Sequence, residues 1–138
     1  MGKLFGTDGI RGRVNCYPMT SQIALNTGMA TGVYCRKKSS KEHYRAVLGR
    51  DSRASGDMLA SAFASGLLSM DVEVLYVGVL PTPAISYLVK ALDADCGVMI
   101  TASHNPATDN GIKIFARDGF KLAEEDTLEL ESLILNED

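Results

Sequence analysis

The residues best suited to chemistry lie in the run Thr-Ala-Ser-His-Asn-Pro, residues 101–106, which directly follows an apolar segment. A serine–histidine nucleophile pair is one interpretation, but adjacent residues tend to point apart and no Gly-x-Ser-x-Gly turn is present. A polar turn, in which Ser103 and Asn105 satisfy backbone groups, is another. We favour a third interpretation, in which Ser103 carries a phosphoryl group and His104 lies beside it.

Lys113, on the next extended segment, could supply positive charge to that group. It alternates with Ile112 and Ile114, so its side chain is expected on the face opposite the two isoleucines. By itself it would be an ordinary solvent-facing lysine. A phosphoserine carries about −1.5 to −2 charge at neutral pH and is stabilised by cationic neighbours. The combination with Ser103 and His104 therefore predicts a role for Lys113.

A glycine-rich and arginine-rich loop stands at the start of the chain. In Phe-Gly-Thr-Asp-Gly-Ile-Arg-Gly-Arg, residues 5–13, the glycines allow backbone N–H groups to approach an anion, and Arg11 or Arg13 could grip phosphate. The loop is neither a Walker A sequence nor Gly-x-Gly-x-x-Gly. A glycine-rich turn with two solvated arginines is the alternative, and this pattern alone does not choose between them.

A second basic loop, Gly-Arg-Asp-Ser-Arg at residues 49–53, lies between a predicted buried strand and a predicted helix. Helix N-termini favour anions, and Arg50 adds positive charge. The alternative is a surface loop in which arginine and aspartate pair with each other. Taken by itself, the loop favours this alternative.

The elements that must position these loops alternate between helix and strand. Helices are expected over residues 23–37 and 124–135, with Thr20 or Ser21 as the N-cap of the first. Two further helices are expected after the N-caps Ser55 and Thr82, with apolar stripes from Met58 to Met70 and from Ile85 to Leu92, and with Pro83 as the first helical residue after Thr82. Strands are expected over residues 46–48, 72–79, 97–101 and 111–116. The small residues Ala24, Gly28 and Gly32 are expected to let the first helix sit close to a sheet.

This alternation predicts an α/β fold, a three-layer α/β/α domain whose mixed, mainly parallel sheet has one antiparallel strand. The sequence Asp-Asn-Gly at residues 109–111 is expected to form a turn that returns the last strand antiparallel beside its predecessor. Ligand sites in such folds form at the carboxyl ends of strands. The three polar loops are therefore expected to lie at or near one end of the sheet.

The composition fits one soluble domain and excludes several classes of protein. The chain has 138 residues, 46% of them hydrophobic and 22% charged, and a formal net charge of −3. That charge does not favour nucleic acid or membrane partners. The three cysteines have no Cys-x-x-Cys spacing, which predicts reduced thiols. No apolar run approaches the length of a membrane span, and the N-terminus lacks the apolar core of a signal peptide. We therefore expect a cytoplasmic protein.

Taken together, these residues resemble the α-D-phosphohexomutase family. Residues 101–106 are similar to its phosphoserine signature, with Ser103 in the place of the phosphorylated serine, and residues 5–12 and 109–115 are similar to two flanking motifs in the right order. Both flanking motifs are most similar to those of the bacterial phosphoglucosamine mutases rather than the phosphomannomutases. The second basic loop also fits, although Arg50 and Ser52 stand where relatives often carry Lys and Thr.

The resemblance implies that residues 1–138 form a single domain, the phosphoserine-bearing N-terminal domain of a four-domain enzyme whose later domains are absent. The implied reaction interconverts glucosamine 6-phosphate and glucosamine 1-phosphate through an activating hexosamine 1,6-bisphosphate. Mg²⁺ would be held by a phosphate oxygen on Ser103 and by ligands from a missing domain. The implied catalytic residues are Ser103, His104, Lys113 and Arg11, and the implied substrate- or phosphate-binding residues are Thr7, Arg11, Arg50, Asn105 and Lys113.

Several alternatives stay open at this point. Either His104 or Lys113 could be the general acid–base, and the sugar could instead be that of a phosphomannomutase or phosphoglucomutase, because the sugar-selecting loop belongs to a later domain. A non-catalytic phosphate-binding module and a purely structural domain are the rival classes. The expected partners are a phosphosugar substrate and the remaining domains of the same chain, with a homodimer possible, and the isolated domain is expected to lack turnover.

Overall fold

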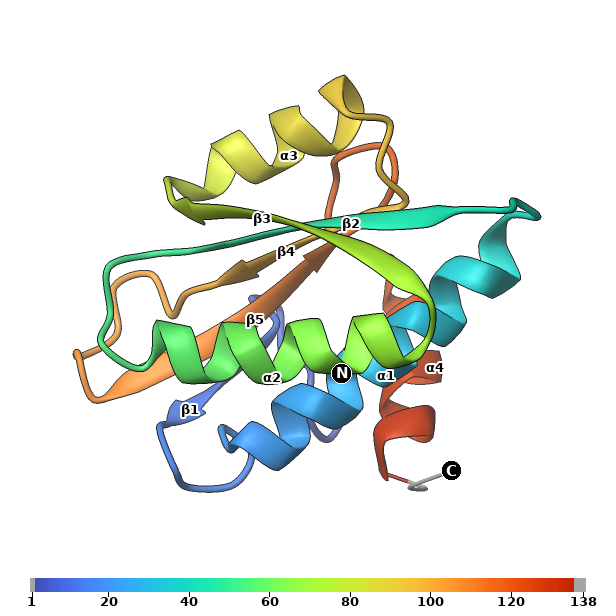
Figure 1. Ribbon diagram of the computed structural model, residues 1–138. Helices are drawn as coiled ribbons and strands as arrows, with labels where there is room; N and C mark the ends of the chain where they lie inside the picture. Colours follow the sequence, from blue (N-terminus) through green and yellow to red (C-terminus); the bar gives the residue numbers. More distant parts are fainter. Residues whose placement is uncertain (1, 136–138) are drawn as a thin grey trace.

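The structure is a computed structural model that describes residues 2–135. Helices and strands alternate along most of the chain (Figure 1). The strands are β1 (Ile10–Arg13), β2 (Tyr44–Arg50), β3 (Val72–Val79), β4 (Cys96–Ile100) and β5 (Asp109–Phe115). The helices are α1 (Ser21–Lys38), α2 (Gly56–Ser69), α3 (Thr82–Ala91) and α4 (Glu124–Leu135).

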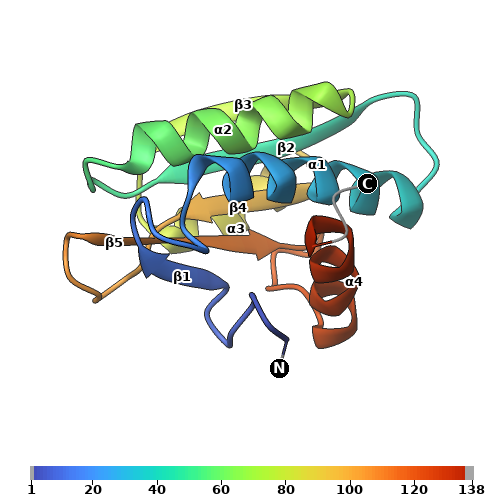
Figure 2. The ribbon, with the colours of Figure 1, turned by 90° about the horizontal axis from the view of Figure 1, so that it is seen from below.

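The strands form one sheet in the order β1-β5-β4-β2-β3. β2 runs parallel to β3 and β4, whereas β5 runs antiparallel to both of its neighbours, β4 and β1. Helices α1 and α2 cover one face of the sheet and α3 covers the other (Figure 1). Helix α4 lies beside α1 at one end of the sheet (Figure 2). The expected three-layer α/β/α fold, with a mixed, mainly parallel sheet and one antiparallel strand, is confirmed.

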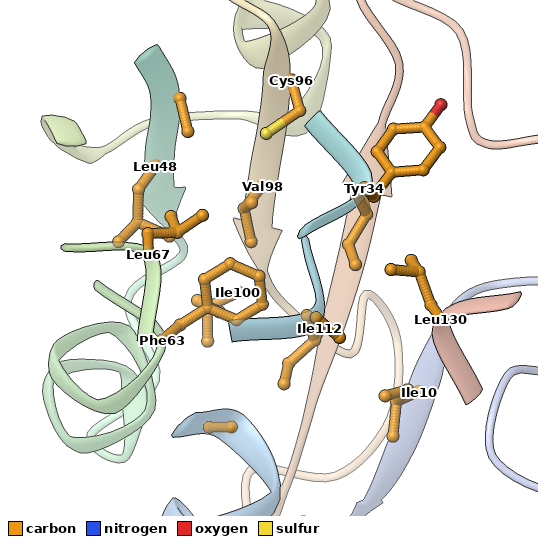
Figure 3. Packing of buried hydrophobic residues seen from close by; sticks show 14 of the residues in the cluster. Ile10, Tyr34, Leu48, Phe63, Leu67, Cys96, Val98, Ile100, Ile112 and Leu130 are labelled. Atoms are coloured by element: carbon orange, nitrogen blue, oxygen red, sulfur yellow. The ribbon is translucent and has the colours of Figure 1, made fainter. Parts of the chain in front are cut away.

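Two apolar clusters hold the layers together. In the larger one, Phe63 and Leu67 of α2 lie in the same cluster as Ile100 and Ile112 of the sheet and Leu130 of α4 (Figure 3). Because successive residues of a strand point to opposite faces, the central strands β2 and β4 are apolar on both sides. Their other face contributes to the smaller cluster beneath α3, which contains Val47, Ile85, Val89, Ala94 and Met99.

The strand β1 is absent from the sequence-based prediction, which treats residues 5–13 as a glycine-rich loop. Its residues pair with β5, with Ile10 opposite Ile112. Ile10 is fully buried, but it is the one apolar residue of the sequence Ile-Arg-Gly-Arg. Because the segment has no alternating apolar pattern, its own sequence does not predict a strand. It becomes a strand by pairing with β5.

The turn predicted at residues 109–111 is wrong, because these residues belong to β5. The chain reverses between Ile100 and Asp109 instead, and the antiparallel return of β5 beside β4 is confirmed. Gly111 is required for a close approach of backbones rather than for a turn. A Cβ at Gly111 would lie 2.6 Å from the Thr101 carbonyl oxygen and 2.8 Å from the Ile10 carbonyl oxygen.

Helix α1 begins as expected and packs differently from the expectation. The Thr20 hydroxyl accepts a hydrogen bond from the Ile23 N–H at 3.2 Å and caps the helix. A Cβ at Gly28 would lie 2.2 Å from the Phe63 carbonyl oxygen, so this glycine allows α1 to cross α2 closely. The prediction that Gly28 brings the helix close to the sheet is therefore wrong.

The starts of α3 and α2 also differ from the prediction in detail. The N-cap of α3 is Pro81, so Thr82 is the first helical residue and Pro83 the second, one position earlier than predicted. Ser55 does stand at the N-cap of α2, but its hydroxyl makes no capping hydrogen bond. It accepts a hydrogen bond at 2.8 Å from the side-chain amide of Asn110, a fully buried residue of β5.

Glu131 of α4 ties down the N-terminal segment. Its carboxylate accepts hydrogen bonds from the backbone N–H groups of Lys3 at 2.8 Å, Leu4 at 3.0 Å and Phe5 at 2.7 Å. Glu131 is buried, as are Leu4 and Phe5. Buried backbone donors need hydrogen-bond acceptors, and this one carboxylate accepts from three of them. Glu131 therefore sets where the loop that leads to β1 begins.

We expect Glu131→Gln to lower the free energy of unfolding of the chain by about 1–3 kcal/mol, because the new amide group replaces one acceptor oxygen with a donor facing backbone N–H groups. Urea denaturation at neutral pH measures this change. Glu129→Gln is the matched control on the same helix, because Glu129 pairs with Lys37 at the surface and such pairs contribute about 0–1 kcal/mol. Equal stability of the two variants would contradict the assignment.

Candidate active site

Ser103 lies at the surface, in the reversal between β4 and β5. Its backbone adopts a φ of +54°, in the left-handed region that non-glycine residues seldom occupy. The Ser103 N–H donates a hydrogen bond to the Thr101 hydroxyl at 3.0 Å, and the Asn105 N–H donates to the Ala102 carbonyl at 3.0 Å. These bonds close a tight turn that presents the Ser103 side chain to solvent.

The Lys113 ammonium group donates a hydrogen bond to the Ser103 hydroxyl oxygen at 3.1 Å. The neighbours Ile112 and Ile114 are buried in the larger apolar cluster on the other face of β5, so the alternation expected from the sequence is borne out by the burial pattern. A pocket of about 380 Å³ adjoins Lys113, and its lining includes Thr7 and Lys121 but not Ser103. Lys113 thus lies between the Ser103 hydroxyl and this pocket.

Arg11 reaches the serine loop, residues 101–109 from the end of β4 to the start of β5, through the side chain of Asn105. The Arg11 guanidinium donates to the Asn105 side-chain oxygen at 3.4 Å and lies 3.9 Å from the Asp8 carboxylate. Asn105 in turn donates to the Asp109 carboxylate at 3.1 Å. The pairing of β1 with β5, which sets Arg11 opposite Gly111, brings this loop from the start of the chain to the site. The glycine-rich loop of residues 5–13 and the loop that carries Ser103 therefore meet, as the sequence predicts.

Arg50 is held by its own loop and by the first turn of α2. Its guanidinium donates to the Asp57 carboxylate, to the Asp51 carbonyl at 3.0 Å and to the Arg53 carbonyl at 2.6 Å. Burial alone would lower the pKa of Arg50, but the hydrogen bond and charge of Asp57 raise it above its ordinary value. The structure does not bring Arg50 to Ser103, because its guanidinium pairs with Asp57 of α2. The pairing of arginine with aspartate within the loop is made by Arg53 and Asp51, at 3.1 Å.

Thr7 and His104, the other residues singled out from the sequence, are both exposed. Thr7 lines the pocket beside Lys113, and its carbonyl oxygen accepts a hydrogen bond from the Lys121 ammonium group at 3.4 Å. The side chain of His104 has no hydrogen bond or ion pair within residues 2–135. It is therefore available to a molecule that approaches Ser103.

Arg53 makes the most extensive contacts with the serine loop, and the sequence analysis assigns it no role. Its guanidinium donates to the carbonyl oxygens of Pro106 at 2.6 Å, Ser103 at 2.8 Å, Asn105 at 3.0 Å and Asp109 at 3.1 Å. Arg53 follows β2, which is parallel and adjacent to β4. Because β2 and β4 are neighbours, the loop of residues 49–53 lies against the loop that carries Ser103. A prediction of this strand order would have indicated the contact.

The Asp51 carboxylate joins Arg53 to the base of the serine loop. It accepts hydrogen bonds from the Arg53 side chain at 3.1 Å and from the Thr101 hydroxyl at 2.6 Å. Burial would raise the pKa of Asp51, but the hydrogen bonds from Thr101 and Arg53, together with the charge of Arg53, lower it below its ordinary value. Asp51 is therefore ionised at neutral pH and holds Arg53 in place.

The described part of the chain does not fit a complete metal site. No group of three His, Cys, Asp or Glu side chains within residues 2–135 could hold a metal ion. In the same range, no helix is both long enough and apolar enough to cross a membrane. These residues provide a surface hydroxyl in a strained turn, with the Lys113 ammonium group in contact with it. The Arg11 guanidinium is bound to Asn105 of the same turn and the Arg53 guanidinium to the Ser103 carbonyl.

Comparisons with known proteins agree on one family. The sequence profile described as phosphoglucomutase/phosphomannomutase, alpha/beta/alpha domain I, matches residues 2–138. A phosphoglucosamine mutase of Paracoccus denitrificans (strain Pd 1222) is 52% identical over 135 residues, which are 98% of this chain and 30% of the relative. One from Citrifermentans bemidjiense is 54% identical over 136 residues, 99% of this chain and 30% of the relative. The chain thus spans about 30% of the length of these relatives.

Solved structures support the same fold. A phosphoglucomutase/phosphomannomutase family protein from Burkholderia thailandensis superposes with a TM-score of 0.82 at 29% identity, over 97% of this chain and 30% of that chain. The phosphoglucomutase parafusin from Paramecium superposes with a TM-score of 0.78 at 24% identity, over 96% of this chain and 25% of that chain. At such identity the second likeness concerns the fold alone.

Proposed function

The chain belongs to the phosphoglucomutase/phosphomannomutase family, as its alpha/beta/alpha domain I, and on that premise we propose that it is the phosphoserine-bearing N-terminal domain of a phosphoglucosamine mutase. The observation that carries this proposal is the exposed Ser103 hydroxyl with the Lys113 ammonium group 3.1 Å away. The names of the relatives at 52–54% identity support glucosamine phosphate as the substrate.

In the proposed reaction, phospho-Ser103 gives its phosphoryl group to the free 1-hydroxyl of glucosamine 6-phosphate. The bond between the Ser103 oxygen and phosphorus breaks, a bond from the sugar oxygen to phosphorus forms, the hydroxyl proton passes to His104 or to the neutral amine form of Lys113, and the leaving Ser103 oxygen takes up a proton. The 1,6-bisphosphate then reorients and returns its 6-phosphoryl group to Ser103, whose hydroxyl gives up its proton, while the proton held by the general acid–base passes to the leaving 6-oxygen. Glucosamine 1-phosphate leaves, and the phosphoserine is restored without loss of atoms.

Charge neutralisation is the main task of the side chains around the transferred group. Lys113 contacts the Ser103 oxygen directly, and we propose that Arg11 binds the same phosphoryl group from the far side of Asn105. Thr7 and Asn105 are proposed to line the path of the sugar phosphate. The contacts of Arg50 with Asp57 argue against a direct part for it.

A bound Mg²⁺ would supply further charge neutralisation, and a phosphate oxygen on Ser103 would be the ligand that this chain offers it. The other ligands, the hexosamine 1,6-bisphosphate activator, the cytoplasmic setting and a homodimer are also proposals that rest on the family resemblance. The described residues hold no cluster that could bind the metal without a further domain, so every proposed step is assigned to the residues of this chain.

The full-length protein tests the proposal. It should convert glucosamine 6-phosphate to the 1-phosphate at least about tenfold faster, in kcat/KM, than it converts mannose 6-phosphate or glucose 6-phosphate, since the sugar preference of a pocket with hydrogen bonds to substrate groups is at least this large. Mapping of the phosphorylated residue by mass spectrometry should find Ser103. A preference for mannose or glucose phosphate would replace the proposed substrate, and phosphate elsewhere would remove the central role of Ser103.

The 138-residue chain by itself is expected to fold but to show no mutase turnover. It spans about 30% of its relatives, and its described residues lack a metal cluster. Circular dichroism and a cooperative urea transition would check folding, and a coupled assay with glucosamine 6-phosphate would check turnover. Measurable conversion by the purified chain would contradict the proposal that other domains complete the site.

A further inference from the structure

We propose that Arg53 is a positioning residue for the phosphoryl transfer, which fixes the Ser103 oxygen relative to the Lys113 ammonium group without touching the substrate. This inference rests on the proposed function. It assigns a role to a residue outside the serine signature, in a loop whose other arginine, Arg50, points away from the site.

The geometry of the guanidinium group is the first argument. A planar guanidinium donates several hydrogen bonds in fixed directions. Two nitrogens of Arg53 donate to four carbonyl oxygens that span the serine loop from Ser103 to Asp109, all between 2.6 and 3.1 Å. The side chain is 11% exposed. A single group therefore holds both ends of the loop together.

The strain of the loop is the second argument. Ser103 has a φ of +54°, and non-glycine residues in this region are strained and persist only where the surrounding structure holds them there. The Ser103 carbonyl is bound by Arg53, and the Ser103 N–H is bound by the Thr101 hydroxyl. The backbone on both sides of the reacting side chain is therefore fixed by one connected set of hydrogen bonds.

The charge arrangement is the third argument. Asp51 accepts from both Arg53 and Thr101, so the two groups that bind the Ser103 backbone share one carboxylate. Phosphoryl transfer depends on alignment, and a displacement of about 1 Å in a reacting group can cost about 10²-fold in rate. Loss of the Arg53 contacts should therefore lower kcat, whereas substrate binding, which depends on other residues, should change little.

The experiment compares Arg53→Lys and Arg53→Met with the wild type in the full-length protein. Lysine keeps the positive charge but has one nitrogen, which cannot bridge the four carbonyl oxygens. We expect both variants to lose about 10²-fold in kcat, with KM for glucosamine 6-phosphate within about threefold of the wild type. The matched control is Arg36→Lys, because Arg36 donates to the Met70 carbonyl on the surface, away from the site. This control should keep wild-type turnover.

Wild-type kcat in Arg53→Lys would overturn the inference, because charge alone would then suffice. If the Arg53 variants do not fold, Thr101→Val decides, since it keeps the side-chain shape and removes the hydrogen bond to the Ser103 N–H. We expect it to lower kcat about tenfold at an unchanged KM, and wild-type kcat in this variant would also overturn the inference. Ser103→Ala in the same series distinguishes failure of the Arg53 inference from failure of the proposed function. Retained turnover in Ser103→Ala would reject the proposed function itself.

Discussion

Ser103→Ala in the full-length protein is expected to lower mutase turnover by at least roughly 10⁴-fold, because the variant has no oxygen to carry the phosphoryl group and loss of a covalent nucleophile has effects of this size or larger. Coupled turnover of glucosamine 6-phosphate measures the loss, and intact-mass measurement should find no phosphoenzyme. The structure supports the expectation through the exposed hydroxyl and its lysine contact at 3.1 Å.

Two further variants test whether a loss of turnover comes from a distorted backbone or from a general effect of replacing a serine. Because Ser103 has a positive φ, Ser103→Gly keeps the backbone conformation without strain and should be equally inactive. Ser40→Ala, at an exposed position outside the site, should keep full turnover. Turnover of Ser103→Ala or Ser103→Gly within tenfold of the wild type would remove Ser103 from the mechanism.

Lys113→Met is expected to lower kcat by about 10²–10³-fold, the usual cost of removing one group that stabilises charge in the transition state. Methionine is unbranched and nearly as long as lysine, but it has no ammonium group to contact the Ser103 oxygen. Steady-state kinetics at saturating substrate measures the change. Lys90→Met, at an exposed position on α3, is the matched control and should leave kcat unchanged.

The same series chooses between the two candidates for the general acid–base. If Lys113 moves the proton, Lys113→Met should abolish one limb of the pH profile of kcat, whereas His104→Gln should retain both limbs. If His104 moves it, the result is reversed, and Lys113 acts through its charge alone. Wild-type kcat in Lys113→Met would reject both roles for the lysine.

The sequence contains enough information to predict the site's central pair. The alternation of Lys113 with two buried isoleucines sets its face, and the antiparallel return of β5 beside β4 brings that face back to Ser103. Both predictions use local information: the first uses the spacing of residues within one strand, and the second uses the fact that the next element along the chain is also a strand. The order of the layers follows from the same kind of pattern.

The remaining contacts depend on pairs of segments that no local pattern connects. β1 is a strand only because β5 lies beside it, and Arg53 binds the serine loop only because β2 and β4 are neighbours. Arg50 and Arg53 are indistinguishable in the sequence of their loop, yet the first turns to Asp57 and the second to the carbonyl groups of the serine loop. Only the three-dimensional arrangement separates them.

The attachment of Lys3, Leu4 and Phe5 to Glu131 has a consequence for biosynthesis. Residues 3–5 find their binding partner, Glu131, 126 to 128 positions later in the sequence, and β1 finds its partner strand β5 only near residue 110, so both are translated long before their partners. Nascent chains otherwise tend to fold from their N-terminal side. Here the segment that carries Arg11 must wait until nearly the whole domain has emerged, so a ribosome that stalls before codon 131 would release a product with its leading segment undocked.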